Sequence, residues 1–91
     1  MSPATLARTN PMATHNRKIA RALAALARNM HSLRTARGLS QQGAADLAGL
    51  HWRHWQKIEA GTMNVTVASL AKVAAALGVD IPALFAPPPK Q

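Results

Sequence analysis

The sequence predicts an all-α fold, a single small domain built as a bundle of helices. Its 91 residues allow only one compact core, because a chain of this length buries about 60 to 65% of its extended surface. Hydrophobic residues make up 48% of the chain and aromatic residues only 3%, and a core rich in alanine suits close-packed helices better than a sheet. Apolar residues also recur every three or four positions, which is the period of a helix face.

The first predicted helix is long and carries one apolar stripe. Its members recur at steps of four, three, four and three residues: Ile19, Leu23, Leu26, Met30 and Leu33. Asn16 can cap a helix from Arg17 to about Arg37, and Gly38 can end it in the left-handed conformation. Residues 1–15 contain two prolines and no sustained period, so we expect a flexible N-terminal arm there.

The next two predicted helices are short. Ser40 can cap the first of them at Gln41, because its hydroxyl accepts hydrogen bonds from the free N–H groups of the first turn. Gly49 can end this helix. Small side chains on it allow a close approach of the following helix, and leucines supply bulk: Ala44, Ala45, Ala48, Leu47 and Leu50.

The second short helix begins only three residues after Gly49. Residues Trp52 to Glu59 repeat at helical spacing, with Trp55 and Ile58 on the face that we expect to be buried. Gly61 closes the segment. Two short helices joined by a tight turn that contains glycine are typical of the helix-turn-helix motif, whose second helix can lie in the major groove of DNA.

The C-terminal third predicts one further helix and a final turn. Thr66 can cap a helix from Val67 to Leu77. The expected buried face of that helix consists of Val67, Leu70, Val73, Ala74 and Leu77. Asp80 can cap a last turn in which Leu84 and Phe85 fold back on the core.

The expected organisation is one folded unit between two extensions. A flexible arm over residues 1–15 precedes the helix-turn-helix domain over residues 16–85. Residues 86–91, with three consecutive prolines, form an extended tail.

The positive charge of the chain is concentrated near its N-terminus. The formal net charge is +8, from 11 Lys and Arg residues against three Asp and Glu residues. The first 37 residues contain no acid and carry seven cations: Arg8, Arg17, Lys18, Arg21, Arg28, Arg34 and Arg37. Such a cluster favours binding to a polyanion such as nucleic acid, because binding releases counterions from the nucleic acid. An anionic membrane would attract the cluster too. The alternative is that these cations only form a solvated surface and bind no partner.

Several functional classes are excluded by what the chain lacks. It contains no cysteine, which excludes disulfides, thiolate catalysis and cysteine zinc sites and permits a reducing cytoplasm. The chain has only three acids and no glycine-rich phosphate loop, so no catalytic nucleophile with a neighbouring general base is evident. We therefore expect neither an enzyme nor a cofactor. His51 and His54 have the spacing of zinc ligands, but no third ligand is evident and we expect no metal site. The apolar run from Ala22 to Ala27 is too short to span a bilayer.

Together these motifs resemble the XRE, or lambda-repressor-like (Cro/C1-type), helix-turn-helix family of bacterial and phage regulators. The resemblance covers about Leu26 to Phe85 and is carried by LRTARGLSQ, Ala45 followed by Gly49, GLHWRHWQKIEAG, and SLAKVAAALGV before the final LF. It implies a five-helix bundle, here with an extended first helix, that binds operator DNA, usually as a symmetric dimer.

The resemblance also implies which residues meet DNA. The positions that match the family's exposed contacts are Gln41, Gln42, Trp52, Arg53, His54, Gln56 and Lys57. Arg53 is the best single base reader, because arginine can form a bidentate hydrogen bond with guanine O6 and N7. Trp52 departs from the family, which usually has a polar residue there. Its indole can either press on a thymine methyl or fold back beside Trp55 as part of the core.

Two further features follow from the comparison with the family. The arginine of the family's LR pair commonly meets the glutamate of its IExG segment, which implies a structural ion pair between Arg34 and Glu59. The family's first helix normally starts near Leu23 to Leu26, but the apolar stripe of this chain continues back to Ile19. We therefore expect residues 17–26 to pack across their own domain or on a second subunit, with Arg17, Lys18 and Arg21 near phosphate.

The predicted function is that of a sequence-specific, double-stranded DNA-binding transcriptional regulator. As a homodimer it would insert helix 52–59 into the major grooves of a palindromic operator, act as a repressor, and reside on the nucleoid in the bacterial cytoplasm. The alternative is an antitoxin or adaptor module whose main ligand is another protein, such as a toxin. A generic nucleoid or single-strand binder is the third reading, which charge alone would support.

Overall fold

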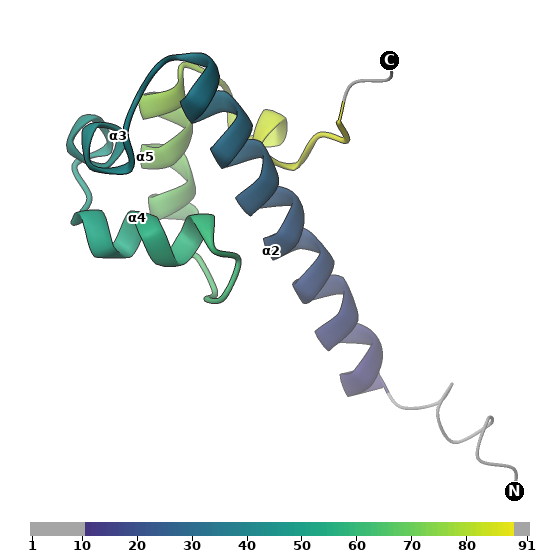
Figure 1. The fold of residues 1–91 in the computed structure, drawn as a ribbon. Helices are drawn as coiled ribbons and strands as arrows, with labels where there is room; N and C mark the ends of the chain where they lie inside the picture. Colours follow the sequence, from purple (N-terminus) through teal and green to yellow (C-terminus); the bar gives the residue numbers. More distant parts are fainter. Residues whose placement is uncertain (1–10, 89–91) are drawn as a thin grey trace, which may run out of the picture.

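The computed structural model describes residues 11–88, and over this range the chain is helical without strands (Figure 1). The all-α prediction is therefore confirmed. The elements are α2 (Pro11–Ala36), α3 (Gln41–Ala48), α4 (Trp52–Glu59), α5 (Val67–Leu77) and the short 3-10 helix η1 (Ile81–Phe85).

Helix α2 starts six residues earlier than the sequence predicts, at Pro11 instead of Arg17. Proline suits the first turn of a helix, because its φ angle is already helical and no partner is needed there for the missing N–H. Residues 11–15 of the expected flexible arm are therefore helical, and Asn16 lies inside α2 instead of capping it. The remainder of the arm, residues 1–10, lies outside the described residues.

Within residues 11–88 the four α-helices form a small bundle from which α2 projects. Helix α3 lies against α4 and α5, and α2 packs on α4 and α5, whereas the N-terminal half of α2 extends away from the bundle (Figure 1). The 3-10 helix η1 lies against α2 and α5. None of the helices in the described part of the chain is long and apolar enough to cross a membrane.

The core is built around one tryptophan and small alanines. Trp55 is fully buried and is packed with buried residues from every element, namely Leu26, Met30, Ala44, Ala45, Ala48, Ile58, Val73, Ala74, Ala76, Leu77 and Leu84. The predicted burial of Trp55, Ile58 and the three alanines of α3 is thus confirmed. Alanine allows the short helices to approach closely, and close approach matters because dispersion contacts fall off steeply with distance.

Two predictions about burial and one about a helix cap are wrong. Val67 is 73% exposed and Leu47 is 62% exposed, although both were expected to pack inward. Periodicity assigns a residue to a helix face, but it does not say whether a neighbouring element reaches that turn of the helix. Asp80 precedes η1, as expected of a cap, but its side chain makes no capping hydrogen bond.

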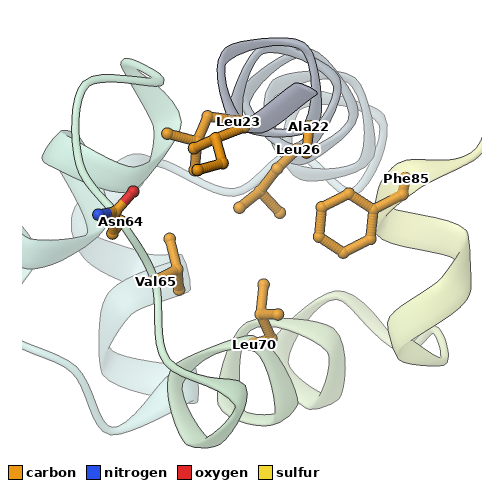
Figure 2. A pocket seen from close by; sticks show the side chains of 8 residues that line it. Ala22, Leu23, Leu26, Asn64, Val65, Leu70 and Phe85 are labelled. Carbon is orange, nitrogen blue, oxygen red and sulfur yellow. The ribbon is translucent and has the colours of Figure 1, made fainter. Parts of the chain in front are cut away.

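An apolar groove lies between the projecting half of α2 and the rest of the bundle. Its volume is about 300 Å³, and it is lined by Ile19, Ala22, Leu23, Leu26, Asn64, Val65, Leu70 and Phe85. Figure 2 shows side chains from α2, the α4–α5 loop, α5 and η1 around a shared space. Leu26 is fully buried at its floor, whereas Ile19 and Phe85 remain 47% and 37% exposed at its edge.

Candidate nucleic-acid interface

Two caps and one glycine set the limits of α3 and the start of α4. The Ser40 hydroxyl accepts a hydrogen bond from the Gly43 N–H at 2.9 Å and so begins α3. Gly49 takes the left-handed conformation, with φ of 69°, at its end. His51 occupies the cap of α4, where its Nδ1 accepts from the Arg53 N–H at 3.1 Å. A histidine thus provides the acceptor that Ser, Thr or Asp usually provides at this position.

Helix α4 has one buried and one exposed face. Trp55 and Ile58 anchor it in the core. Arg53 and Lys57 are exposed. They lie four residues, or about one helical turn, apart, and each is two residues from the buried Trp55. Two residues correspond to about half a turn, so both side chains lie on the opposite side of α4 from Trp55. His54 is half-buried at the edge between the faces. The exposed face of α4 is therefore cationic.

Trp52 belongs to this exposed face and not to the core. Its side chain is 38% exposed, in contrast to the fully buried Trp55. The ring lies against the His51 imidazole, with centroids 6.4 Å apart and an interplanar angle of 22°. The guanidinium carbon of Arg53 lies 5.8 Å from the Trp52 ring centroid, within the range of a cation–π contact. Three neighbouring side chains therefore restrain one another at the start of α4.

Arg34 and Glu59 form a bidentate ion pair that joins α2 to α4. The Arg34 Nε donates to Glu59 Oε1 at 2.8 Å, and its Nη2 donates to Oε2 at 3.0 Å. The remaining terminal nitrogen, Nη1, donates to the Leu39 carbonyl at 2.8 Å. The two side chains are only 12% and 6% exposed, so the pair is held at low solvent exposure, where charged hydrogen bonds are strong.

Glu59 also accepts hydrogen bonds from α3 and from its own helix. Gln41 Nε2 donates to Glu59 Oε2 at 2.8 Å, and the indole N–H of Trp55 donates to Oε1 at 3.1 Å. Desolvation acts to raise the pKa of the Glu59 carboxyl, but the hydrogen bonds from Arg34, Trp55 and Gln41 outweigh it and the pKa lies below its usual range. The hydrogen bond to Glu59 correspondingly raises the pKa of Arg34.

Gln41 and Gln56 are joined to this network, a connection that the sequence did not reveal. Gln56 Nε2 donates to Gln41 Oε1 at 3.3 Å, so α4 and α3 are linked through two amide side chains. Both residues are half-buried, whereas the adjacent Gln42 is exposed at the start of α3. Because both polar ends of Gln41 have internal partners, its side chain acts first as a bridge within the motif. The spacing of 15 residues between the two glutamines carries no local signal of this contact.

Metal binding has no visible basis in the described part of the chain. Over that range no group of three or more His, Cys, Asp or Glu side chains could hold a metal ion. The His51 side chain caps the start of α4.

Helices α3 and α4, joined by a short turn that contains Gly49, form the helix-turn-helix motif. Residues 25–86 match the family model described as a helix-turn-helix domain. The chain belongs to this family, the XRE or lambda-repressor-like regulators. It is therefore a DNA-binding protein of a transcription-regulator family and not a member of an enzyme family.

The chain is similar to two controller proteins and to a hypothetical transcription factor. The control protein C.SmaI of Serratia marcescens is 37% identical over 60 residues, which cover 66% of this chain and 71% of the relative. Among solved structures, the restriction-modification controller protein C.AhdI from Aeromonas hydrophila is 36% identical, with a TM-score of 0.66 over 69% of this chain and 96% of its own. A hypothetical transcription factor, NHTF, from Neisseria is 35% identical, with a TM-score of 0.72 over 75% of this chain and 76% of the NHTF chain.

Proposed function

We propose that this chain is a sequence-specific transcriptional regulator that inserts α4 into the major groove of a bacterial or phage operator. The exposed pair of Arg53 and Lys57 on a helix anchored by Trp55 is the observation that carries the proposal. Arginine reads guanine by a bidentate hydrogen bond, and lysine supplies a point charge for guanine or phosphate. Repression by occupying a promoter is the economical mode of action, with the protein located on the nucleoid in the cytoplasm.

The proposed regulator acts as a homodimer on a palindromic operator. We infer that a second copy of the chain covers the apolar groove along α2. Ile19 and Leu23 line the groove. By helical spacing, the exposed cations Arg17 and Arg21 lie on the opposite side of α2. Two equally cationic chains can therefore meet through this groove without bringing those charges face to face. The same arrangement leaves Arg17 and Arg21 free to approach phosphate.

Selection of bound duplexes from a random pool tests this function directly. We expect enriched sites with two inverted half-sites whose centres lie about 34 to 36 Å apart, one turn of B-DNA. We also expect affinity for those sites to fall steeply with salt concentration, because phosphate contacts release counterions. An unenriched pool would contradict the proposal, and binding without sequence preference would identify a generic nucleoid protein instead.

The apolar groove is also the observation that favours the second candidate function, an antitoxin or adaptor whose main ligand is another protein, such as a toxin. Its exposed edge residues Ile19 and Phe85 could receive an apolar segment of such a ligand. The two functions differ in their salt dependence. A protein ligand held by this groove would stay bound when salt is raised, because burial of apolar surface is not weakened by screening.

A further inference from the structure

Trp52 and Arg53 are the first two residues of α4, and with the capping residue His51 they form a group that we call the Trp52 cluster. We propose that the Trp52 cluster binds a guanine together with a neighbouring pyrimidine that carries a C5 methyl group, so that methylation of cytosine in an operator strengthens binding. This inference rests on the proposed function, because it assigns a base preference to a helix that is proposed to lie in the major groove.

The indole of Trp52 is restrained by the residues on either side of it. The Nδ1 atom of His51 accepts a hydrogen bond from the Arg53 N–H at 3.1 Å, which holds the imidazole in place as the cap of α4. The Trp52 ring lies against this imidazole, and the Arg53 guanidinium carbon lies over the Trp52 ring. The indole is nevertheless 38% exposed. A large apolar ring that is already ordered is well suited to contact a ligand, because little further ordering is needed on binding.

Arg53 determines which part of the groove the indole can reach. A guanidinium that forms a bidentate hydrogen bond with guanine occupies the O6 and N7 atoms of that base. The centroid of the Trp52 ring lies 5.8 Å from the guanidinium carbon, and base pairs stack about 3.4 Å apart. The base pair next to the guanine is therefore within reach of the indole. Because Trp52 precedes Arg53 in the first turn of α4, both residues belong to the end of a recognition helix that contacts base edges.

The apolar group that this neighbouring base pair can offer is the C5 methyl group of a pyrimidine. Thymine carries the methyl group on its major-groove edge, and 5-methylcytosine carries it on the same ring atom. Unmodified cytosine has only a hydrogen atom there. Burial of the methyl group against the indole is favourable, whereas the polar edges of purines gain little from an apolar ring. Trp52 is therefore matched to thymine and to 5-methylcytosine, and it couples operator affinity to cytosine methylation.

Selection from an unmodified random duplex pool locates the contact. We expect the wild-type protein to enrich a guanine with a thymine in the neighbouring base pair. In the same selection, Trp52→Ala should keep the guanine and lose the preference for thymine. Lys57→Ala is the matched control, because it removes another exposed side chain of α4 and should keep both preferences.

Two pairs of duplexes that differ by one methyl group then measure the contact. Uracil replaces thymine in the first pair, and 5-methylcytosine replaces cytosine in the second. We expect the wild-type protein to bind the methylated member of each pair about 4-fold more tightly for each half-site changed, which corresponds to about 0.8 kcal/mol for one buried methyl group. Trp52→Ala should bind the two members of each pair nearly equally.

Each outcome decides a separate point. An unenriched wild-type pool would overturn the proposed function and this inference together. An enriched pool with equal wild-type affinities within either duplex pair would overturn the inference alone. A methyl preference that persists in Trp52→Ala would also overturn it, because another side chain would then contact the methyl group. If circular dichroism shows that Trp52→Ala is unfolded, Trp52→Ser provides the same test, since serine is well tolerated at helix starts.

Discussion

At the scale of single residues, Glu59 holds the motif together. Its carboxylate accepts four hydrogen bonds, two from Arg34 and one each from Gln41 and Trp55, so three helices converge on it. The side chain is only 6% exposed. A buried carboxylate of this kind is favourable only while its partners remain, because an uncompensated buried charge is costly.

Replacing Glu59 should therefore destabilise the fold. We expect Glu59→Ala to lower the free energy of unfolding by about 3 to 5 kcal/mol, because it leaves the Arg34 guanidinium buried without its counter-charge. Urea denaturation followed by circular dichroism would measure the loss. Asp46→Ala is the matched control, since it removes another acid from an exposed position on α3, and exposed substitutions usually change stability by less than about 0.5 kcal/mol. Similar stabilities of the two variants would contradict this role of Glu59.

The same carboxylate should make stability depend on pH. Because the pKa of Glu59 is lower in the folded state than in the unfolded chain, the folded state binds fewer protons. The ionised Glu59 carboxylate contributes fully to the free energy of unfolding above the ordinary glutamate pKa of about 4.3. This contribution is lost as the pH falls through the pKa that Glu59 has in the folded state. We expect the stability difference between the wild type and Glu59→Gln to be constant near neutral pH and to shrink below about pH 4. A difference that grows on acidification would show the opposite sign.

Arg53 is the residue at which specificity and charge can be separated. Arg53→Lys keeps the charge but loses the bidentate geometry, so affinity for the selected operator should fall by about 5- to 150-fold, equivalent to about 1 to 3 kcal/mol. Affinity for random duplex and its salt dependence should change little. Arg28→Lys makes the same substitution at an exposed position of α2 and controls for the lost guanidinium. An equal loss on operator and random duplex would assign Arg53 to phosphate instead.

At the scale of secondary-structure elements, the position of α4 depends on how closely its C-terminal turn meets α2. Gly61 has a φ of +74°, and a Cβ atom placed there would lie 3.4 Å from the Ala27 Cβ and 3.5 Å from the Leu23 carbonyl oxygen. Gly38 has a similar φ of +68°, but nothing lies within 4 Å of its Cβ position. The two glycines thus share a backbone requirement and differ in packing.

Leucine at each of these glycines separates the two contributions. Both Gly38→Leu and Gly61→Leu should lose about 1 to 2 kcal/mol, because an L-residue is strained in the left-handed conformation. Gly61→Leu should lose a further 1 to 3 kcal/mol, roughly the cost of forcing extra atoms into a packed contact. Chemical denaturation of both variants gives the comparison. Equal losses would mean that the contact between α2 and the end of α4 can yield without cost.

At the scale of the whole molecule, the most prominent feature is the projecting half of α2 with its apolar groove. Ile19 and Phe85 stay exposed on the described chain although their neighbours Leu26 and Leu84 are fully buried. A large exposed apolar surface on a small protein often marks an interface. The proposed dimer uses this groove, and it would give the two α4 helices a fixed separation on DNA.

A charge introduced into the groove should weaken that dimer. We expect Ile19→Glu to raise the dimer dissociation constant at least 10-fold, about 1.4 kcal/mol, because the carboxylate would lose its hydration in the interface. Ala24→Glu introduces the same charge on the same helix at an exposed position turned away from the stripe and should leave the constant nearly unchanged. Sedimentation equilibrium measures both variants. Equal effects of the two substitutions would place the dimer surface elsewhere.

The sequence alone predicted the helices around the helix-turn-helix motif, and it also indicated the family. This was possible because the signals depend on local chemistry. Ser40 and Thr66 cap helices as predicted, and the period of three and four residues identified Trp55 and Ile58 as buried. Each of these features depends on residues within about one helical turn, so it can be read without knowing the rest of the fold.

The tertiary structure decided what distant segments do to one another. The exposure of Val67 and the direction of the Gln41 amide differ from or go beyond the predictions. Neither has a local signal, because each depends on which element lies opposite, and residues 18 positions apart such as Gln41 and Glu59 meet only after the helices have packed. The sequence by itself thus determined that α4 forms and which residues it exposes, whereas packing decided how its polar side chains are oriented.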